Sequence, residues 1–118
     1  MAAPDTTTAA VRPTMATPDD ALTICAISVV ASMVSTMLHE GLGHALLALR
    51  TGAASGVLSS VAWSSAFDSR LVAAGGTLVN LAAALVLWLC LRAAQNAPPA
   101  LRFFLLIAMA FNLFTGTG

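Results

Sequence analysis

The 118-residue chain has no lysine, no tyrosine and few charges of either sign, with five arginines against five acidic residues and a net charge of zero. Charged residues make up 8% of the sequence, whereas a soluble domain carries about 25%. This scarcity excludes an ordinary water-soluble globule, and a chain without a basic excess is not expected to bind nucleic acid. The two cysteines, Cys25 and Cys90, lie within apolar segments, where thiols usually pack as small apolar side chains, and we expect no disulfide.

Apolar residues, by contrast, make up 58% of the chain and gather into three long runs. A membrane-spanning helix needs roughly 20 mainly apolar residues, so the runs predict transmembrane helices at about 21–50, 71–92 and 100–116. The predicted fold class is an all-α integral membrane protein with three transmembrane helices, and the lipid bilayer is one expected partner. Residues 1–20 are rich in Pro, Thr and Ala and lack apolar periodicity, which predicts a disordered tail ahead of a transmembrane domain at 21–118.

Residues 51–70 connect the first two predicted helices and are unusually apolar for an aqueous loop. We expect the stretch 57–67 to form a short strand or a re-entrant, hairpin-like turn. At membrane depth such a turn requires protein to cover its backbone groups. Alternatively, Trp63 marks the membrane interface, where tryptophan is enriched because its ring is amphipathic.

A polar stripe runs along the first predicted helix. Ser28, Ser32, Ser35 and His39 recur at spacings of four, three and four and so share one face of the helix. We expect these side chains, and Asn80 of the second helix, to face the protein interior, because lipid offers no hydrogen-bond partners.

The sequence LHEGLGHAL at residues 38–46 places His39, Glu40 and His44 inside the first apolar run. An ionisable side chain in a membrane span costs about 3 kcal/mol by insertion scales, so three of them within six residues indicate a function. Two imidazoles beside a carboxylate are the parts of a zinc hydrolase: the histidines bind the metal, and the glutamate takes a proton from the attacking water. We therefore expect Zn²⁺ as the cofactor, His39 and His44 as its ligands, and Glu40 as the catalytic base.

The spacing of the histidines departs from the usual His-Glu-x-x-His motif, in which they lie at i and i+4. At i and i+5, a regular α-helix separates His39 and His44 by roughly 140°, too far around the helix to share one ion. A π-bulge would absorb the extra residue and restore a shared face, and Gly41 and Gly43 make the backbone pliable enough for it. The alternative is that Glu40 and His44, which lie at i and i+4, form the metal pair.

The motif His-Glu-x-x-Gly-His at 39–44 is similar to that of the dipeptidyl peptidase III family. In that family the motif has the same extra residue, and both of its histidines still bind zinc. That likeness covers six residues and implies no shared fold. A wider resemblance, over about residues 30–118, is to the site-2 protease family of intramembrane zinc metalloproteases. Its members carry the histidine–glutamate motif in a membrane helix, then a hairpin-like connection, then a helix with a Gly-x-x-x-Asn signature.

Two further segments carry this resemblance. The sequence AAGGTLVNLAAAL at 73–85 looks like the second family signature, with Gly76 in place of the usual proline and Asn80 matching the asparagine. The resemblance implies that Asn80 helps to position substrate. The third signature, Asn-x-x-Pro followed by an aspartate that completes the zinc shell, begins at Asn112, but Thr115 stands where the proline is expected.

Catalytic zinc usually has three protein ligands, and here the third ligand is unknown. We expect it from a continuation of the chain past Gly118; failing that, Asp68 or a second subunit would have to supply it. The function that the resemblance implies is a zinc metalloendopeptidase, embedded in the bacterial cytoplasmic membrane, that cleaves transmembrane or juxtamembrane segments of a membrane protein substrate. The alternative is a non-catalytic site-2-protease-like membrane protein that uses the same helices as a binding or assembly module.

Overall fold

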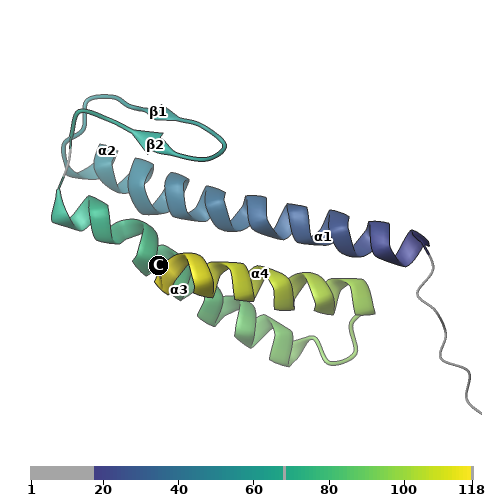
Figure 1. The fold of residues 1–118 in the computed structure, drawn as a ribbon. Helices are drawn as coiled ribbons and strands as arrows, with labels where there is room; N and C mark the ends of the chain where they lie inside the picture. Colours follow the sequence, from purple (N-terminus) through teal and green to yellow (C-terminus); the bar gives the residue numbers. More distant parts are fainter. Residues whose placement is uncertain (1–17, 68, 118) are drawn as a thin grey trace, which may run out of the picture.

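The structure, a computed structural model, describes residues 18–67 and 69–117. Three helical segments, α1 (Pro18–Met37), η1 (Leu38–Leu46) and α2 (Leu47–Thr51), follow one another without a break. They form a single long rod, as Figure 1 shows. The one long first helix predicted from the apolar run is therefore present.

The rod ends at Gly52, whose φ of 135° lies in a region that glycine adopts without a side-chain clash. The N–H groups of Gly52 and Ala53 both bond to the carbonyl of Ala48, which satisfies the helix end. The chain then forms an antiparallel hairpin of β1 (Val57–Leu58) and β2 (Trp63–Ser64). The hairpin confirms the strand expected in this connection, and it folds back along the rod (Figure 1).

Two further helices, α3 (Arg70–Ala93) and α4 (Pro99–Thr117), follow the hairpin. Ser69 caps the start of α3, since its side-chain oxygen accepts the N–H of Val72 at 3.1 Å. Pro99 opens α4 at the first helical position, where the missing N–H leaves no bond unmade. α3 packs against both η1 and α4, and α4 also packs against α1, so the long helices form one bundle (Figure 1).

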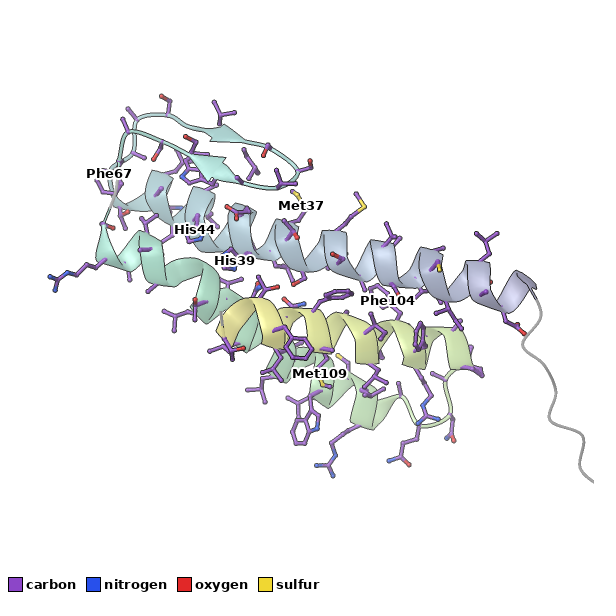
Figure 2. All side chains as sticks on the ribbon, in the orientation of Figure 1. Met37, His39, His44, Phe67, Phe104 and Met109 are labelled. Carbon is purple, nitrogen blue, oxygen red and sulfur yellow. The ribbon has the colours of Figure 1, made fainter. Side chains whose placement is uncertain are left out.

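The rod from Asp20 to Thr51, α3 and α4 are all long and apolar enough to cross a membrane. The interior of the bundle is built from small side chains; the buried alanines of the helices are Ala31, Ala45, Ala48, Ala84 and Ala108. Many large apolar side chains point outward instead (Figure 2). Small residues inside and large apolar residues outside are typical of membrane helices, which pack backbone to backbone and face lipid. The predicted fold class is confirmed: a mostly helical chain with three such helices and a hairpin after the first.

The polar stripe of the rod faces the bundle most strongly at Ser35, which is buried, as is Asn80 on α3. Ser28, Ser32 and His39 are half-buried. The Ser28 hydroxyl donates to the carbonyl of Ile24 one turn earlier and so needs no partner on another helix. The two cysteines are free and exposed.

Candidate metal centre

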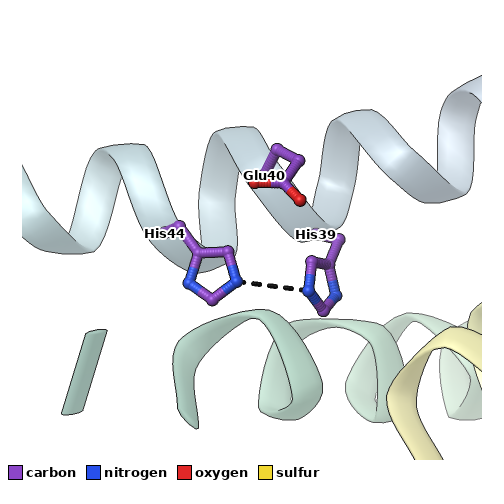
Figure 3. Close-up of side chains that lie close together, drawn as sticks. All are labelled: His39, Glu40 and His44. Carbon is purple, nitrogen blue, oxygen red and sulfur yellow. Dashed lines mark hydrogen bonds between the residues drawn. The ribbon is translucent and has the colours of Figure 1, made fainter. Parts of the chain in front are cut away.

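The motif residues form a π-helix, η1, over Leu38–Leu46. In a π-helix each N–H bonds to the carbonyl five residues back, so residue i+5 returns to the face of residue i. His39 and His44 therefore point the same way, toward α3, as Figure 3 shows. The bulge predicted from the spacing is confirmed, and it extends over two turns rather than a single one.

Glycines allow η1 to lie directly on α3. A Cβ built on Gly43 would fall onto the backbone of Gly76, and one built on Gly75 would fall onto the carbonyl of Gly43. The two helices thus touch through their main chains, and a side chain at either position would force them apart. This contact places the histidine face of η1 against the first turns of α3.

The two imidazoles meet through their Nε2 atoms, which are 3.2 Å apart. Their ring centroids are 4.8 Å apart and the ring planes are close to perpendicular, at 78°. The Nδ1 of His44 lies 2.7 Å from the carbonyl oxygen of Val72. Because a carbonyl can only accept, Nδ1 of His44 donates in this contact, and its Nε2 is the nitrogen that faces His39.

Gly76 of α3 lies immediately beside this nitrogen pair. A Cβ at this position would be 2.5 Å from His39 Nε2 and 2.6 Å from His44 Nε2. Contacts this short do not occur between a real side chain and its neighbours, so only glycine leaves room for the two nitrogens to converge here. A Cβ here would therefore press on both nitrogens.

Glu40 projects from a different side of η1 than the two histidines, as Figure 3 shows. Its carboxylate contacts the hairpin. Its Oε2 accepts a hydrogen bond from the peptide N–H of Trp63, at a distance of 2.7 Å. It is the only Asp, Glu, Lys or Arg of the rod between Asp20 and Arg50, and about 15 Å of helix separates it from Arg50. A lone carboxylate this far inside an apolar span needs a partner, and the hairpin supplies one.

A cleft of about 490 Å³ opens between the hairpin and the two helices. Glu40 and His44 line one wall, β2 and the residues on either side of it line a second, and Val72 with Ala73 of α3 lines the rest. The cleft is large enough for a short stretch of extended peptide. The carboxylate and one imidazole of the motif are therefore reachable from outside the bundle.

His39, Glu40 and His44 form a group whose candidate ligand atoms all lie within 4.8 Å of one another. Two imidazole nitrogens held about 2.0–2.1 Å from a tetrahedral zinc ion lie roughly 3.3–3.4 Å apart, and the Nε2 atoms here are 3.2 Å apart. Imidazole and carboxylate ligands suit zinc among the divalent metals. The separation of the two histidine nitrogens thus fits a metal ion held between them, with the Glu40 carboxylate within 4.8 Å of the same atoms.

Asn80 lies one helical turn after Gly76, with its side chain fully buried. It does not line the cleft, and neither its Oδ1 nor its Nδ2 makes a hydrogen bond with the part of the chain that the structure describes. Asn112 of α4 is equally buried, and its Nδ2 donates to the carbonyl of Ala108 at 2.8 Å. Asp68, one of the expected sources of a third ligand, lies outside the described residues.

Two groups of the site were not identified from the sequence: the N–H of Trp63, which holds Glu40, and the carbonyl of Val72, which orients His44. Both belong to the main chain, which every residue has, so neither leaves a signature in the amino-acid sequence. The side chain of Trp63 indicates an interface residue and carries no sign of the role of its N–H.

Comparison of the chain with family models, with curated proteins and with solved structures found no match. The likeness to the site-2 proteases therefore depends on the motif residues alone. The chain has three helices that are long and apolar enough to cross a membrane, and one of them carries a histidine–glutamate–histidine group.

Proposed function

We propose that this chain is a membrane-embedded zinc metalloprotease of the site-2 type. The observation that supports it most directly is the convergence of the His39 and His44 Nε2 atoms, 3.2 Å apart, in a helix apolar enough to cross a membrane. Two imidazoles that share a hydrogen bond can have a purely structural role, but this pair has a carboxylate within 4.8 Å and a cleft beside it. Metal-assisted hydrolysis uses a pair of imidazole ligands, a carboxylate base and an accessible cleft of this kind.

Each residue of the site would have a separate role in hydrolysis. His39 and His44 would hold the zinc ion, which when bound polarises a peptide carbonyl and promotes attack by water. Glu40 would take a proton from that water and then return it to the departing amine nitrogen. The Val72 carbonyl keeps the His44 ring in the tautomer that leaves Nε2 free for the metal.

The substrate class follows from the position of the cleft. β2 forms one wall of the cleft and Glu40 and His44 another, so a peptide in extended form would lie between them. We infer that the substrate is a transmembrane or juxtamembrane segment of another membrane protein, unwound and added to the hairpin as a strand. The bacterial cytoplasmic membrane is the location that we propose with it.

Metal analysis tests the first part of this proposal. The chain and its His39→Ala and His44→Ala variants would be purified in detergent, exposed to equimolar zinc, dialysed and assayed for bound metal. We expect the parent chain to retain zinc and both variants to lose it. Leu42→Ala, on the outer side of η1 and 49% exposed, is the matched control and should retain zinc. A parent chain that retains no more zinc than the histidine variants would show that there is no metal centre.

The third ligand can be sought in the same experiment. Asp68→Ala would lose zinc if Asp68 completes the shell. If a second subunit completes it, the zinc retained per chain would fall when the protein is diluted until the subunits separate. Hydrolysis would then be tested on single-span membrane proteins reconstituted in liposomes, with the parent chain and the metal-free His39→Ala variant side by side.

The alternative function, a non-catalytic binding or assembly module, has one observation in its favour. With Glu40 acting as the base, the described residues supply two metal ligands at this site, and catalytic zinc usually has three. The two functions separate on hydrolysis: the module would bind a membrane partner without cleaving it.

A further inference from the structure

The peptide N–H that holds Glu40 belongs to the free edge of the hairpin. The strands pair in the register Val57 with Ser64 and Leu58 with Trp63, and the N–H of Ser59 bonds to the carbonyl of Ala62. Hydrogen-bonded and non-hydrogen-bonded pairs alternate along an antiparallel ladder. Leu58 and Trp63 are therefore a non-hydrogen-bonded pair, and the N–H of Trp63 points away from β1, into the cleft.

The position of this N–H is fixed by the packing of its own residue. The indole ring of Trp63 lies across Gly56 so closely that a Cβ at Gly56 would collide with it. Trp63 and Phe67 also pack against the buried cluster of Ala48, Ala53 and Val72, which joins the base of the hairpin to α2 and α3. The side chain thus anchors the hairpin, while the main chain contacts Glu40.

Glu40 and an incoming strand would compete for the same donor. An extended segment that pairs with the free edge of β2 must offer a carbonyl to the N–H of Trp63, because strand addition proceeds through main-chain hydrogen bonds. That N–H already donates to Glu40 Oε2 at 2.7 Å. A single N–H cannot serve both acceptors at full strength, so binding of the strand displaces the carboxylate.

We propose that an extended peptide pairing with the free edge of β2 takes the Trp63 N–H from Glu40, so that substrate docking itself frees the catalytic base. This inference rests on the proposed protease function. In the absence of a strand, the carboxylate is occupied by the Trp63 N–H although it already lies within 4.8 Å of the histidine ligand atoms. With a strand present, that hydrogen bond is lost and the carboxylate is free to accept a proton. The contact therefore restrains the base until a polypeptide occupies the cleft.

Peptide binding to the zinc-free chain in detergent tests the competition without any cleavage. The probe is a fluorescein-labelled six-residue Val/Thr peptide, followed by fluorescence anisotropy, and the same peptide with alternate N-methyl groups is the negative control. Glu40→Ala removes the competing acceptor and should tighten binding about tenfold, the size expected for a hydrogen bond to a charged group. Glu40→Gln keeps a neutral acceptor and should lie between. An unchanged affinity in Glu40→Ala would overturn the proposal.

A double-mutant cycle assigns the effect to the Trp63 N–H. Trp63→Pro removes this N–H but leaves the ladder to β1 intact, since the lost donor faces away from β1. Trp63→Ala is the matched control, because it also loses the indole but keeps the N–H. The gain from Glu40→Ala should vanish in the Trp63→Pro background and persist in the Trp63→Ala background. An equal gain in both would refute the competition.

Amide hydrogen exchange at Trp63 gives a measurement that does not depend on the proline variant folding. Exchange should be slow in the parent chain, faster in Glu40→Ala and slow again when the peptide is added. If the peptide does not restore protection, the peptide does not use this N–H and the inference fails. Because none of these measurements needs zinc or hydrolysis, that failure is distinguishable from a failure of the protease function.

Discussion

Gly76→Ala is the substitution that most sharply tests the arrangement of the histidines. A Cβ at this position would lie 2.5 Å from His39 Cε1, 2.5 Å from His39 Nε2 and 2.6 Å from His44 Nε2. Ordinary contacts between such atoms are at about 3.5 Å, so each imidazole would have to move by roughly 1 Å. A zinc site tolerates deviations of only about 0.2 Å in its ligand distances. One added methyl group should therefore separate the pair of metal ligands.

The same substitution should leave the bundle folded. The atoms that the new Cβ would meet are at the ends of side chains that can rotate away, and alanine is favoured over glycine within a helix by about 1 kcal/mol. We expect zinc affinity to fall by at least the 10–100-fold that is typical of changes around a metal site, with little change in thermal stability. A zinc titration against a chromophoric chelator and a circular-dichroism melt, both in detergent, measure the two quantities.

Two other glycines make matched controls. Gly41→Ala adds a Cβ whose only near neighbour is Leu58 Cδ2 at 3.9 Å, and it should retain zinc. Gly75→Ala would instead press on the carbonyl of Gly43, which is backbone and cannot rotate away, so it should lose both zinc and stability. If Gly76→Ala binds zinc as tightly as the parent chain, the imidazoles do not meet at α3 and the metal centre described here is incorrect.

Three further predictions concern the motif and the polar stripe. Deleting Gly41 returns the histidines to i and i+4 and should convert η1 to an α-helix with zinc binding retained. Deleting Gly43 should instead abolish zinc binding, because it brings a larger side chain against α3. Zinc titration of both deletion variants measures the difference. Glu40→Gln should retain zinc while hydrolysis of a membrane substrate falls by about 10²–10⁴-fold; loss of zinc would instead make Glu40 a ligand. A cysteine at Ser35, which is 1% exposed, should resist a lipid-phase maleimide that labels a cysteine at Val29, 59% exposed, and equal labelling would contradict the packing of the rod.

The membrane spans and the π-turn could be predicted from the sequence, because both are set by physical constraints on side chains. The length of an apolar run is set by the thickness of the bilayer, so three spans followed from composition alone, and their bounds agree closely with the rod, α3 and α4. The π-turn followed from a second constraint: two histidines five residues apart can share an ion only if the helix widens. Glycines at 41 and 43 made that widening acceptable.

The remaining parts of the site depend on contacts between segments far apart in the chain. The Trp63 N–H and the Val72 carbonyl act through the main chain, and no residue type signals which peptide group will meet which side chain. Asn80 shows the opposite case. Its residue type suggested a place at the site, but its side chain is buried one turn away and does not line the cleft, so its role in positioning substrate stays a prediction.

The two departures from the site-2 pattern, the extra residue in the motif and Gly76 in place of proline, occur at facing positions of η1 and α3. The widened turn carries both imidazoles, together with Gly43, against the main chain of α3. A proline at 76 would have a Cβ, as alanine does, and that atom would lie among the imidazole nitrogens. It would also lack the N–H that α3 uses in its own helix. With the histidines placed as they are here, glycine is the residue that position 76 requires. The expanded motif and the missing proline are thus one structural solution: the first brings the two histidines onto α3, and the second leaves room for them there.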